Sequence, residues 1–144
     1  MSECVFCEIV AGRGPASSFY EDDDLLGLMT IGPVTPGHAM VIPKTHAPGL
    51  ADLDERLGRR IWTVAQRTAA ALRESNLRCE GVNFFLADGE AAFQEVSHLH
   101  LHVFPRFEGD SFKLDADWDF RPARKELDAA ASEIKRAYAL LWPD

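Results

Sequence analysis

The sequence predicts an α+β domain in which an antiparallel sheet of about five strands packs against one long central helix, with a further helix near the C-terminal end. Two observations lead to this prediction. Short apolar runs bounded by glycine, proline or acidic residues lie on either side of one long amphipathic segment, and no repeat or low-complexity linker interrupts them. In addition, a chain of 144 residues with 47% hydrophobic residues can bury one substantial core but not two. We therefore expect a single domain over residues 1–144.

The N-terminal part is expected to form a short helix, a hairpin and one further strand. The helix candidate ends where two glycines and a proline follow it, because these residues stop helices. Three consecutive aspartates form the turn of the hairpin, and a loop with two prolines and two glycines follows its second arm. The expected ranges are residues 4–12 for the helix, 19–21 and 25–29 for the hairpin arms, 30–37 for the loop and 38–43 for the strand.

The central helix is predicted to begin with a capping box, in which Asp52 precedes a glutamate by three positions, and to run to about Ser75. Its apolar positions recur at helical spacing and should face the sheet; they are Leu57, Ile61, Val64, Ala65, Thr68 and Leu72. The remaining elements are strands over 81–86 and 97–105 and a last helix over about 123–142, whose apolar stripe is Leu127, Ile134, Tyr138 and Leu141.

Charge and hydropathy limit the partners of the chain. The net charge of −8 argues against sequence-independent binding of nucleic acid, which depends on clustered lysine and arginine side chains. No apolar run approaches the roughly 20 residues that span a bilayer, and residues 1–4 carry no basic segment followed by an apolar stretch. We therefore expect a cytoplasmic protein without nucleic-acid or membrane partners, in which local donors hold any phosphate ligand.

Three of the five histidines alternate with apolar residues in the predicted strand over 97–105. Successive side chains of a strand point to opposite faces, so His98, His100 and His102 should share one face about 7 Å apart. Each buried imidazole needs hydrogen-bond partners, so stability alone does not explain such a row. The row indicates either a metal site with imidazole ligands or phosphate chemistry in which one neutral imidazole is the nucleophile.

A Cys-x-x-Cys pair, Cys4 and Cys7, lies at the start of the chain. A redox pair is expected directly after a strand and at the start of a helix, and no strand precedes residue 4. A zinc site needs two further ligands, and free thiols are the remaining alternative. The third cysteine, Cys79, is interpreted as a small apolar residue near the start of a strand.

The segment from His98 to Phe104 resembles the signature of the histidine triad (HIT) family, which is His-x-His-x-His followed by two apolar residues. Further similar segments are residues 22–29 and 36–46 in the first half of that domain, in its Hint-like branch, and Gln94 and residues 105–106 in its second half. The resemblance implies a HIT-like fold with a core over about 4–107 and a C-terminal extension over about 108–144.

The resemblance places His38, His98, His100 and His102 in the catalytic site, with His100 as the nucleophile that would attack the α-phosphorus of a nucleotide. A nucleophilic imidazole must be neutral with one nitrogen free, so its other nitrogen should donate to an acceptor such as a backbone carbonyl. His102 and His38 would donate to the non-bridging phosphate oxygens, and Gln94 would contact the α-phosphate or its bridging atom. The implied nucleoside pocket comprises Phe6, Leu28, Thr30 and Ile31.

Some Hint-like members carry a structural zinc, and the resemblance assigns its ligands here to Cys4, Cys7, His46 and His98. Such a closed tetrahedral site would pin the N-terminus to the core. No catalytic metal or organic cofactor is expected. The family commonly pairs as a two-fold dimer, so the resemblance also implies a homodimer.

Four positions depart from the family pattern. Thr30 replaces an acidic or amide residue that binds the ribose, and Ala87 replaces an amide residue that helps to bind the nucleotide. Glu95 replaces a serine or threonine that contacts phosphate, so its carboxylate would repel the substrate unless it is protonated, turned away or used as a general acid. Phe93 replaces a glycine, and phenylalanine adopts a positive φ only at an energetic cost.

The expected function is hydrolysis at the α-phosphate of a purine nucleotide conjugate through a covalent nucleotidyl-histidine. The conjugate would be a nucleoside phosphoramidate or a dinucleoside polyphosphate. A nucleotidyl transferase would pass the same intermediate to phosphate instead of water. A nucleotide-binding regulatory protein with little turnover is a further alternative, favoured by the departures at Thr30, Ala87 and Glu95. The last alternative is a metal hydrolase that uses the three strand histidines as ligands.

Overall fold

The computed structural model describes residues 4–144, and its internal contacts divide the chain into two units, one ending at Phe112 and the other spanning Lys113–Asp144. The elements of the first unit are α1 (Val5–Val10), β1 (Ser18–Glu21), β2 (Leu25–Met29), β3 (Ala39–Pro43), the 3₁₀ helix η1 (Leu50–Asp52), α2 (Glu55–Glu74), β4 (Gly81–Leu86), the 3₁₀ helix η2 (Glu90–Ala92) and β5 (Leu101–Arg106). The second unit contains α3 (Arg124–Leu141).

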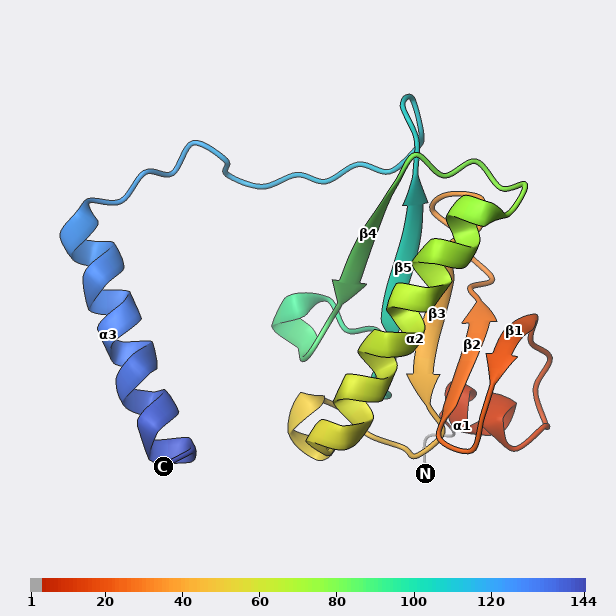
Figure 1. Cartoon of the computed structure of the whole chain (residues 1–144), viewed down its shortest axis with the longest axis horizontal. Coiled ribbons are helices and arrows are strands. Elements are labelled where there is room, and N and C mark those ends of the chain that lie inside the picture. Colours follow the sequence, from red (N-terminus) through yellow and green to blue (C-terminus); the bar gives the residue numbers. More distant parts are fainter. Residues whose placement is uncertain (1–3) are drawn as a thin grey trace. The chain divides into compact units, whose positions relative to one another are not determined.

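The five strands form one antiparallel sheet in the order β1-β2-β3-β5-β4 (Figure 1). The α+β class with five antiparallel strands is therefore confirmed. Strand β5 lies between β3 and β4, and His102 is opposite Met40 on one side and opposite Phe85 on the other. This register places His102 in the interior of the sheet rather than at an edge.

Strand β5 starts at Leu101, so the expected strand over 97–105 begins too early. His98 and His100 precede the strand. The His98 amide donates to the carbonyl of Val96 at 2.8 Å, and the Leu99 amide donates to the carbonyl of Ala47 at 2.7 Å. These bonds satisfy the backbone without a neighbouring strand, which is why the regular ladder starts later.

The two faces of the sheet carry different layers. Helix α2 covers one face (Figure 1), where its apolar side chains pack with residues of β2, β3 and β5; this cluster is Leu25, Ala39, Val41, Leu57, Ile61, Val64, Ala65, Leu72, Leu101 and Val103. The opposite face packs against α1 through Phe6, Leu26, Leu28, Met40 and Ile42. All six residues predicted for the sheet-facing side of α2 are buried, including Thr68, whose hydroxyl donates to the Val64 carbonyl at 2.8 Å.

The predicted cap of α2 is wrong by two positions. Asp54 is the N-cap, and its Oδ1 accepts a hydrogen bond from the Leu57 amide at 2.6 Å. Asp52 ends η1 instead and accepts from the Gly49 amide at 3.0 Å. Both aspartates are good cap residues, so the spacing to a following glutamate does not decide between them.

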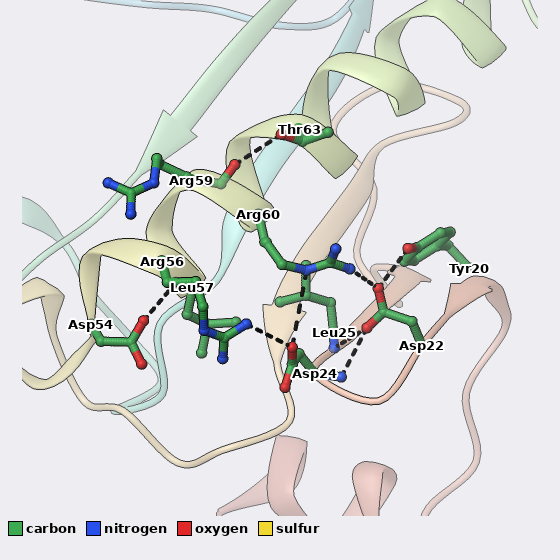
Figure 2. Close-up of polar contacts among 10 residues, drawn as sticks. All are labelled: Tyr20, Asp22, Asp24, Leu25, Asp54, Arg56, Leu57, Arg59, Arg60 and Thr63. Atoms are coloured by element: carbon green, nitrogen blue, oxygen red, sulfur yellow. Dashed lines mark hydrogen bonds and ion pairs between the residues drawn. The ribbon is translucent and has the colours of Figure 1, made fainter.

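The acidic turn between β1 and β2 is anchored to the first turns of α2 (Figure 2). Asp22 accepts hydrogen bonds from the Tyr20 hydroxyl at 2.6 Å, from two amides of its own turn at 2.8 Å, and from Arg60. Arg56 pairs with Asp24 at 3.1 Å. Burial acts to raise the pKa of Asp22, but the hydrogen bonds and the Arg60 charge outweigh burial and lower the pKa to about 2.

Asp22→Asn is therefore expected to lower the free energy of unfolding at pH 7 by about 1–2 kcal/mol. The folded pKa of about 2 lies below the ordinary value of 3.8, so this contribution is present above about pH 4 and is lost as the pH falls toward 2. Urea unfolding at pH 7 and near pH 2 measures it, with Asp23→Asn on the same turn as the control. An equal loss of stability at both pH values would contradict the assignment.

The second unit contains the predicted C-terminal helix. Residues 113–123 form no helix or strand, and α3 follows with its N-terminus closed by a hydrogen bond from the Ala123 amide to the Glu126 side chain at 3.1 Å. No residue of α3 is buried, so the predicted apolar stripe is exposed. Within residues 4–144, no helix combines the length and the apolarity needed to cross a membrane.

Candidate active site and metal cluster

A cleft of about 1120 Å³ lies on the sheet face opposite α2. The loop before β3 supplies His38, the segment before β5 supplies His100, and β5 itself supplies His102. The cleft also brings together the other residues predicted for substrate binding, except Gln94; these are Phe6, Leu28, Thr30, Ile31 and Glu95. The sequence-predicted catalytic and nucleoside-binding residues therefore meet in one cavity, and His98 lies beside it.

His100 is held in one tautomer by its backbone surroundings. Its Nδ1 lies 2.8 Å from the backbone carbonyl oxygen of His98. Because a carbonyl oxygen only accepts, Nδ1 carries the proton and Nε2 keeps a free lone pair. The Phe6 ring packs against the imidazole with 5.1 Å between centroids, which restricts its rotation. The expected hydrogen bond from His100 to a backbone carbonyl is confirmed.

A second set of hydrogen bonds fixes His38 and His102. The Val34 amide donates to Nδ1 of His38 at 3.2 Å, and Nε2 of His38 lies 2.8 Å from Nδ1 of His102. A backbone N–H only donates, so the proton of neutral His38 is on Nε2 and is donated to His102. The proton of neutral His102 is then on its own Nε2. This relay makes Nε2 of His102 a hydrogen-bond donor.

Burial favours the uncharged form of His38 and His102 in the cleft and of His98 beside it. Burial lowers the pKa of His38 to about 4. Burial, followed by the proximity of His100 and His38, lowers the pKa of His102 to about 4. Burial also lowers the pKa of His98, although its hydrogen bond to Pro43 opposes this effect. The tautomers derived for His38 and His102 therefore describe the uncharged rings that are present near neutral pH.

The expected contact of His38 with phosphate oxygens stays a prediction and would compete with hydrogen bonds that its ring already makes. Both ring nitrogens of His38 already have partners, Val34 and His102, and its side chain is buried. The sequence could not show this, because a histidine after Pro36-Gly37 looks equally suited to reach a ligand. Through these bonds His38 orients His102.

The polar atoms of the Gln94 side chain have partners within the protein, and the expected contact of Gln94 with the α-phosphate or its bridging atom, through side chain or backbone, stays a prediction. Its Nε2 donates to the carbonyls of Pro48 at 2.6 Å and Val96 at 3.1 Å, and its Oε1 accepts from the Gly89 amide at 2.8 Å. These three bonds close the loop that precedes the triad and use the polar atoms of the amide. Gln94 therefore shapes the loop, and its side chain does not line the cleft.

Two departures from the family pattern lie on this loop and face the cleft. Phe93 has φ 64°, a left-handed conformation that a phenylalanine rarely adopts, and its side chain is 82% exposed. The backbone at position 93 thus has the conformation that favours glycine. Phenylalanine adopts it at the energetic cost that the sequence predicted. Glu95 follows two residues later, is exposed, and lines the same cavity as His100 and His102.

The residues predicted to bind metal form a compact cluster next to the cleft. The ligand atoms of Cys4, Cys7, His46 and His98 all lie within 4.8 Å of one another. The His98 Nδ1 is 3.4 Å from the Cys4 Sγ, 3.6 Å from the Cys7 Sγ and 3.3 Å from the His46 Nδ1. In a tetrahedral zinc site, bond lengths of about 2.0–2.3 Å put neighbouring ligand atoms roughly 3.3–3.8 Å apart. The three distances from the His98 Nδ1 match this requirement, as does the 3.3 Å between the Cys7 Sγ and the His46 Nδ1.

The tautomer of His98 also fits a metal ligand. Its Nε2 lies 2.8 Å from the Pro43 carbonyl oxygen, so Nε2 carries the proton and Nδ1 offers its lone pair to the cluster. A metal-bound histidine typically donates its other N–H in this way. Because the carbonyl of the same residue accepts from His100, His98 joins the cluster to the cleft.

The sequence analysis missed Phe104 and two backbone groups. The Phe104 ring stacks on His102 at 5.5 Å with an interplanar angle of 16°, and its centroid is 4.1 Å from that of His38. The alternation of side chains that places His98, His100 and His102 on one face continues to Phe104. This pattern could have predicted that the Phe104 ring lies beside the histidines. The Val34 amide and the Pro43 carbonyl carry no sequence signal, because every residue has a carbonyl and nearly every residue has an amide.

The fold and the cleft define a small α+β protein that presents buried histidines beside a Cys/His cluster. The HIT domain model matches residues 11–109. The protein named hit from Bacillus subtilis (strain 168) is 36% identical over 141 residues, which are 94% of each chain. The chain belongs to the HIT family.

Two further relatives bear on the two sites. The crystal structure of a zinc-bound histidine triad family protein from Mycobacterium smegmatis has a TM-score of 0.75 and 45% identity, covering 94% of this chain and 97% of that chain. Adenylylsulfatase HINT3 from Arabidopsis thaliana is 31% identical over 133 residues, 92% of this chain and 66% of that protein.

Proposed function

We propose that this protein hydrolyses purine nucleotide conjugates at the α-phosphate, with His100 as the nucleophile. The observation that carries the proposal is the tautomer of His100, because the bond from Nδ1 to the His98 carbonyl leaves Nε2 unprotonated in a ring that lines the cleft. Such an imidazole attacks phosphorus without first losing a proton. The proposed substrates are nucleoside phosphoramidates and dinucleoside polyphosphates.

The proposed reaction has two displacements at the same phosphorus. First, Nε2 of His100 bonds to the α-phosphorus while the bond to the leaving group breaks; the leaving group keeps the electron pair and takes up a proton where its basicity requires one. Water then bonds to the phosphorus and the phosphorus–nitrogen bond breaks. The electron pair returns to Nε2, the nucleoside monophosphate is released, and one water proton passes to solvent.

His102 and His38 are proposed to stabilise the charge that develops on phosphate. The N–H of His102 at Nε2 would donate to a non-bridging oxygen. His38 is a positioning residue, because it holds the His102 tautomer through the relay that starts at the Val34 amide. Donors that are already oriented need no rearrangement during the reaction, which is why a buried relay suits this step.

The apolar side chains of Phe6, Leu28 and Ile31 are proposed to hold the base, and Thr30 the ribose. Phe6 and Leu28 are buried and line the cleft, whereas Ile31 is fully exposed at its rim. The Thr30 hydroxyl accepts from the Gly32 amide at 3.3 Å, so its own proton remains for a ribose oxygen. A relative named adenylylsulfatase supports an adenylyl group as the nucleotide part.

We also propose that the cluster of Cys4, Cys7, His46 and His98 holds a structural zinc. Its interatomic distances, the tautomer of His98 and the zinc-bound relative from Mycobacterium smegmatis support this proposal. Zinc supplies four bonds that would tie the start of α1 to the segment before β5. Three protein ligands and an open position would be expected of a catalytic zinc, whereas this set has four.

Release of nucleoside monophosphate tests the proposed function. The parent protein is incubated with adenosine phosphoramidate, adenylyl sulfate and diadenosine polyphosphates in isotopically labelled water, and the products are weighed by mass spectrometry. We expect adenosine monophosphate that carries one labelled oxygen. Tight binding without release would contradict hydrolysis and favour a regulatory protein, and formation of adenosine diphosphate that requires inorganic phosphate would favour a transferase.

A further inference from the structure

The charges around the cleft do not match an anionic ligand. Among the residues of 4–144 that line the cavity, the charged side chains are those of Glu8 and Glu95, and none is a lysine or an arginine. Glu8 is neutralised by Arg13, which donates to its two carboxylate oxygens at 2.5 and 2.8 Å. Glu95 has no hydrogen bond or ion pair with any residue in the described range of 4–144. One uncompensated carboxylate therefore faces the cavity that holds His100 and His102.

We propose that Glu95 selects nucleotide conjugates whose leaving group carries a positive charge. This inference rests on the proposed hydrolysis at the α-phosphate and names the substrate class within it. A carboxylate beside a phosphate repels the anion, and a cation on the leaving side of the phosphorus offsets that repulsion. A polyphosphate leaving group adds negative charge beside Glu95, so the carboxylate disfavours it.

Phe93 supports the same class of leaving group. Its ring is 82% exposed, lines the same cavity, and is held by a backbone at φ 64°. An exposed aromatic face attracts an ammonium or guanidinium group through its quadrupole. A carboxylate and an aromatic ring two residues apart on one loop thus offer both of the interactions that recognise an organic cation.

The chemistry of the proposed reaction favours an amine that bears the cation. In a phosphoramidate the leaving atom is nitrogen, and the bond from phosphorus to nitrogen breaks as His100 bonds to phosphorus. The departing amine takes up a proton from solvent, and the second, permanently charged group of the same molecule remains near Glu95. The inferred substrates are therefore nucleoside phosphoramidates of diamines or of basic amino acids.

Three adenosine phosphoramidates of matched chain length test this inference. Their leaving amines end in an ammonium group, a methyl group or a carboxylate. For each we compare kcat/KM in the parent, in Glu95→Gln, and in Glu90→Gln, which removes one charge from an exposed side chain on the same loop outside the cavity. We expect the parent to prefer the ammonium compound over the methyl compound by roughly tenfold and to disfavour the carboxylate compound by a similar factor.

Glu95→Gln should remove both preferences, and Glu90→Gln should keep them. Added salt should reduce the preferences of the parent, because the charges interact near solvent. Turnover of all three compounds at equal rates, or an unchanged preference in Glu95→Gln, would overturn the inference while leaving the proposed hydrolysis intact. Absence of nucleotide release from all three compounds would overturn the proposed function and this inference with it.

Discussion

Replacing His100 with alanine is expected to lower nucleotide release by at least about 10⁴-fold while changing nucleotide affinity by less than about tenfold. The reason is that Nε2 of His100 makes and breaks a bond to phosphorus, whereas the base and the phosphate have other contacts in the cleft. His100 is 8% exposed and packs on Phe6, so alanine leaves a space at the edge of the cleft. The His98 carbonyl loses its donor, which is a modest cost.

The measurement combines single-turnover kinetics with mass spectrometry of the intact protein. The reaction is stopped without acid. The parent should show a transient covalent adduct of one nucleotidyl group, and His100→Ala should show none. Calorimetric titration with adenosine monophosphate checks that the variant still binds. His100→Gly with added imidazole supplies the missing ring from solution, and partial recovery of release is expected. An adduct or substantial turnover in His100→Ala would rule out His100 as the nucleophile.

Alternation in the sequence was sufficient to locate one wall of the cleft. The repeat at His98, His100 and His102 predicted shared chemistry from side-chain geometry alone. The structure separates the roles within that repeat: His98 turns to the Cys/His cluster, and the other two line the cleft. The segment before β5 departs from the sheet ladder at this point, and a strand pattern does not predict where a ladder begins.

The parts that sequence could not predict depend on backbone groups. The tautomers of His38, His98 and His100 follow from the amide of Val34 and the carbonyls of Pro43 and His98. Backbone partners depend on how loops approach in three dimensions, and a residue's identity says little about that approach. Gln94 shows the same limit, since an amide able to bind phosphate is equally able to close a loop.

Cys4→Ser is expected to reduce the zinc content well below one ion per chain and to lower the free energy of unfolding by about 2–4 kcal/mol. The cluster joins the start of α1 to His46 and His98, which are far apart in sequence, so a bound zinc would add contacts that the short helix α1 cannot supply alone. Serine keeps the size of the side chain but is a poor ligand for zinc. Cys79→Ser is the matched control, because its thiol lies outside the cluster and donates to the Gly81 carbonyl.

Elemental analysis and thermal unfolding with and without a chelator measure the effect. The parent should unfold at a lower temperature in the chelator, Cys4→Ser should be insensitive to it, and Cys79→Ser should respond like the parent. Nucleotide release by folded protein should fall much less than stability, because the proposed nucleophile is an imidazole and not a metal-bound water. Release that stops completely in chelator while the protein stays folded would instead favour a metal hydrolase. If the parent protein neither contains zinc nor is stabilised by added zinc, the proposal of a structural zinc is contradicted. Since the carbonyl of His98 orients His100, a small loss of rate in Cys4→Ser would show how far the cluster supports the nucleophile through one residue.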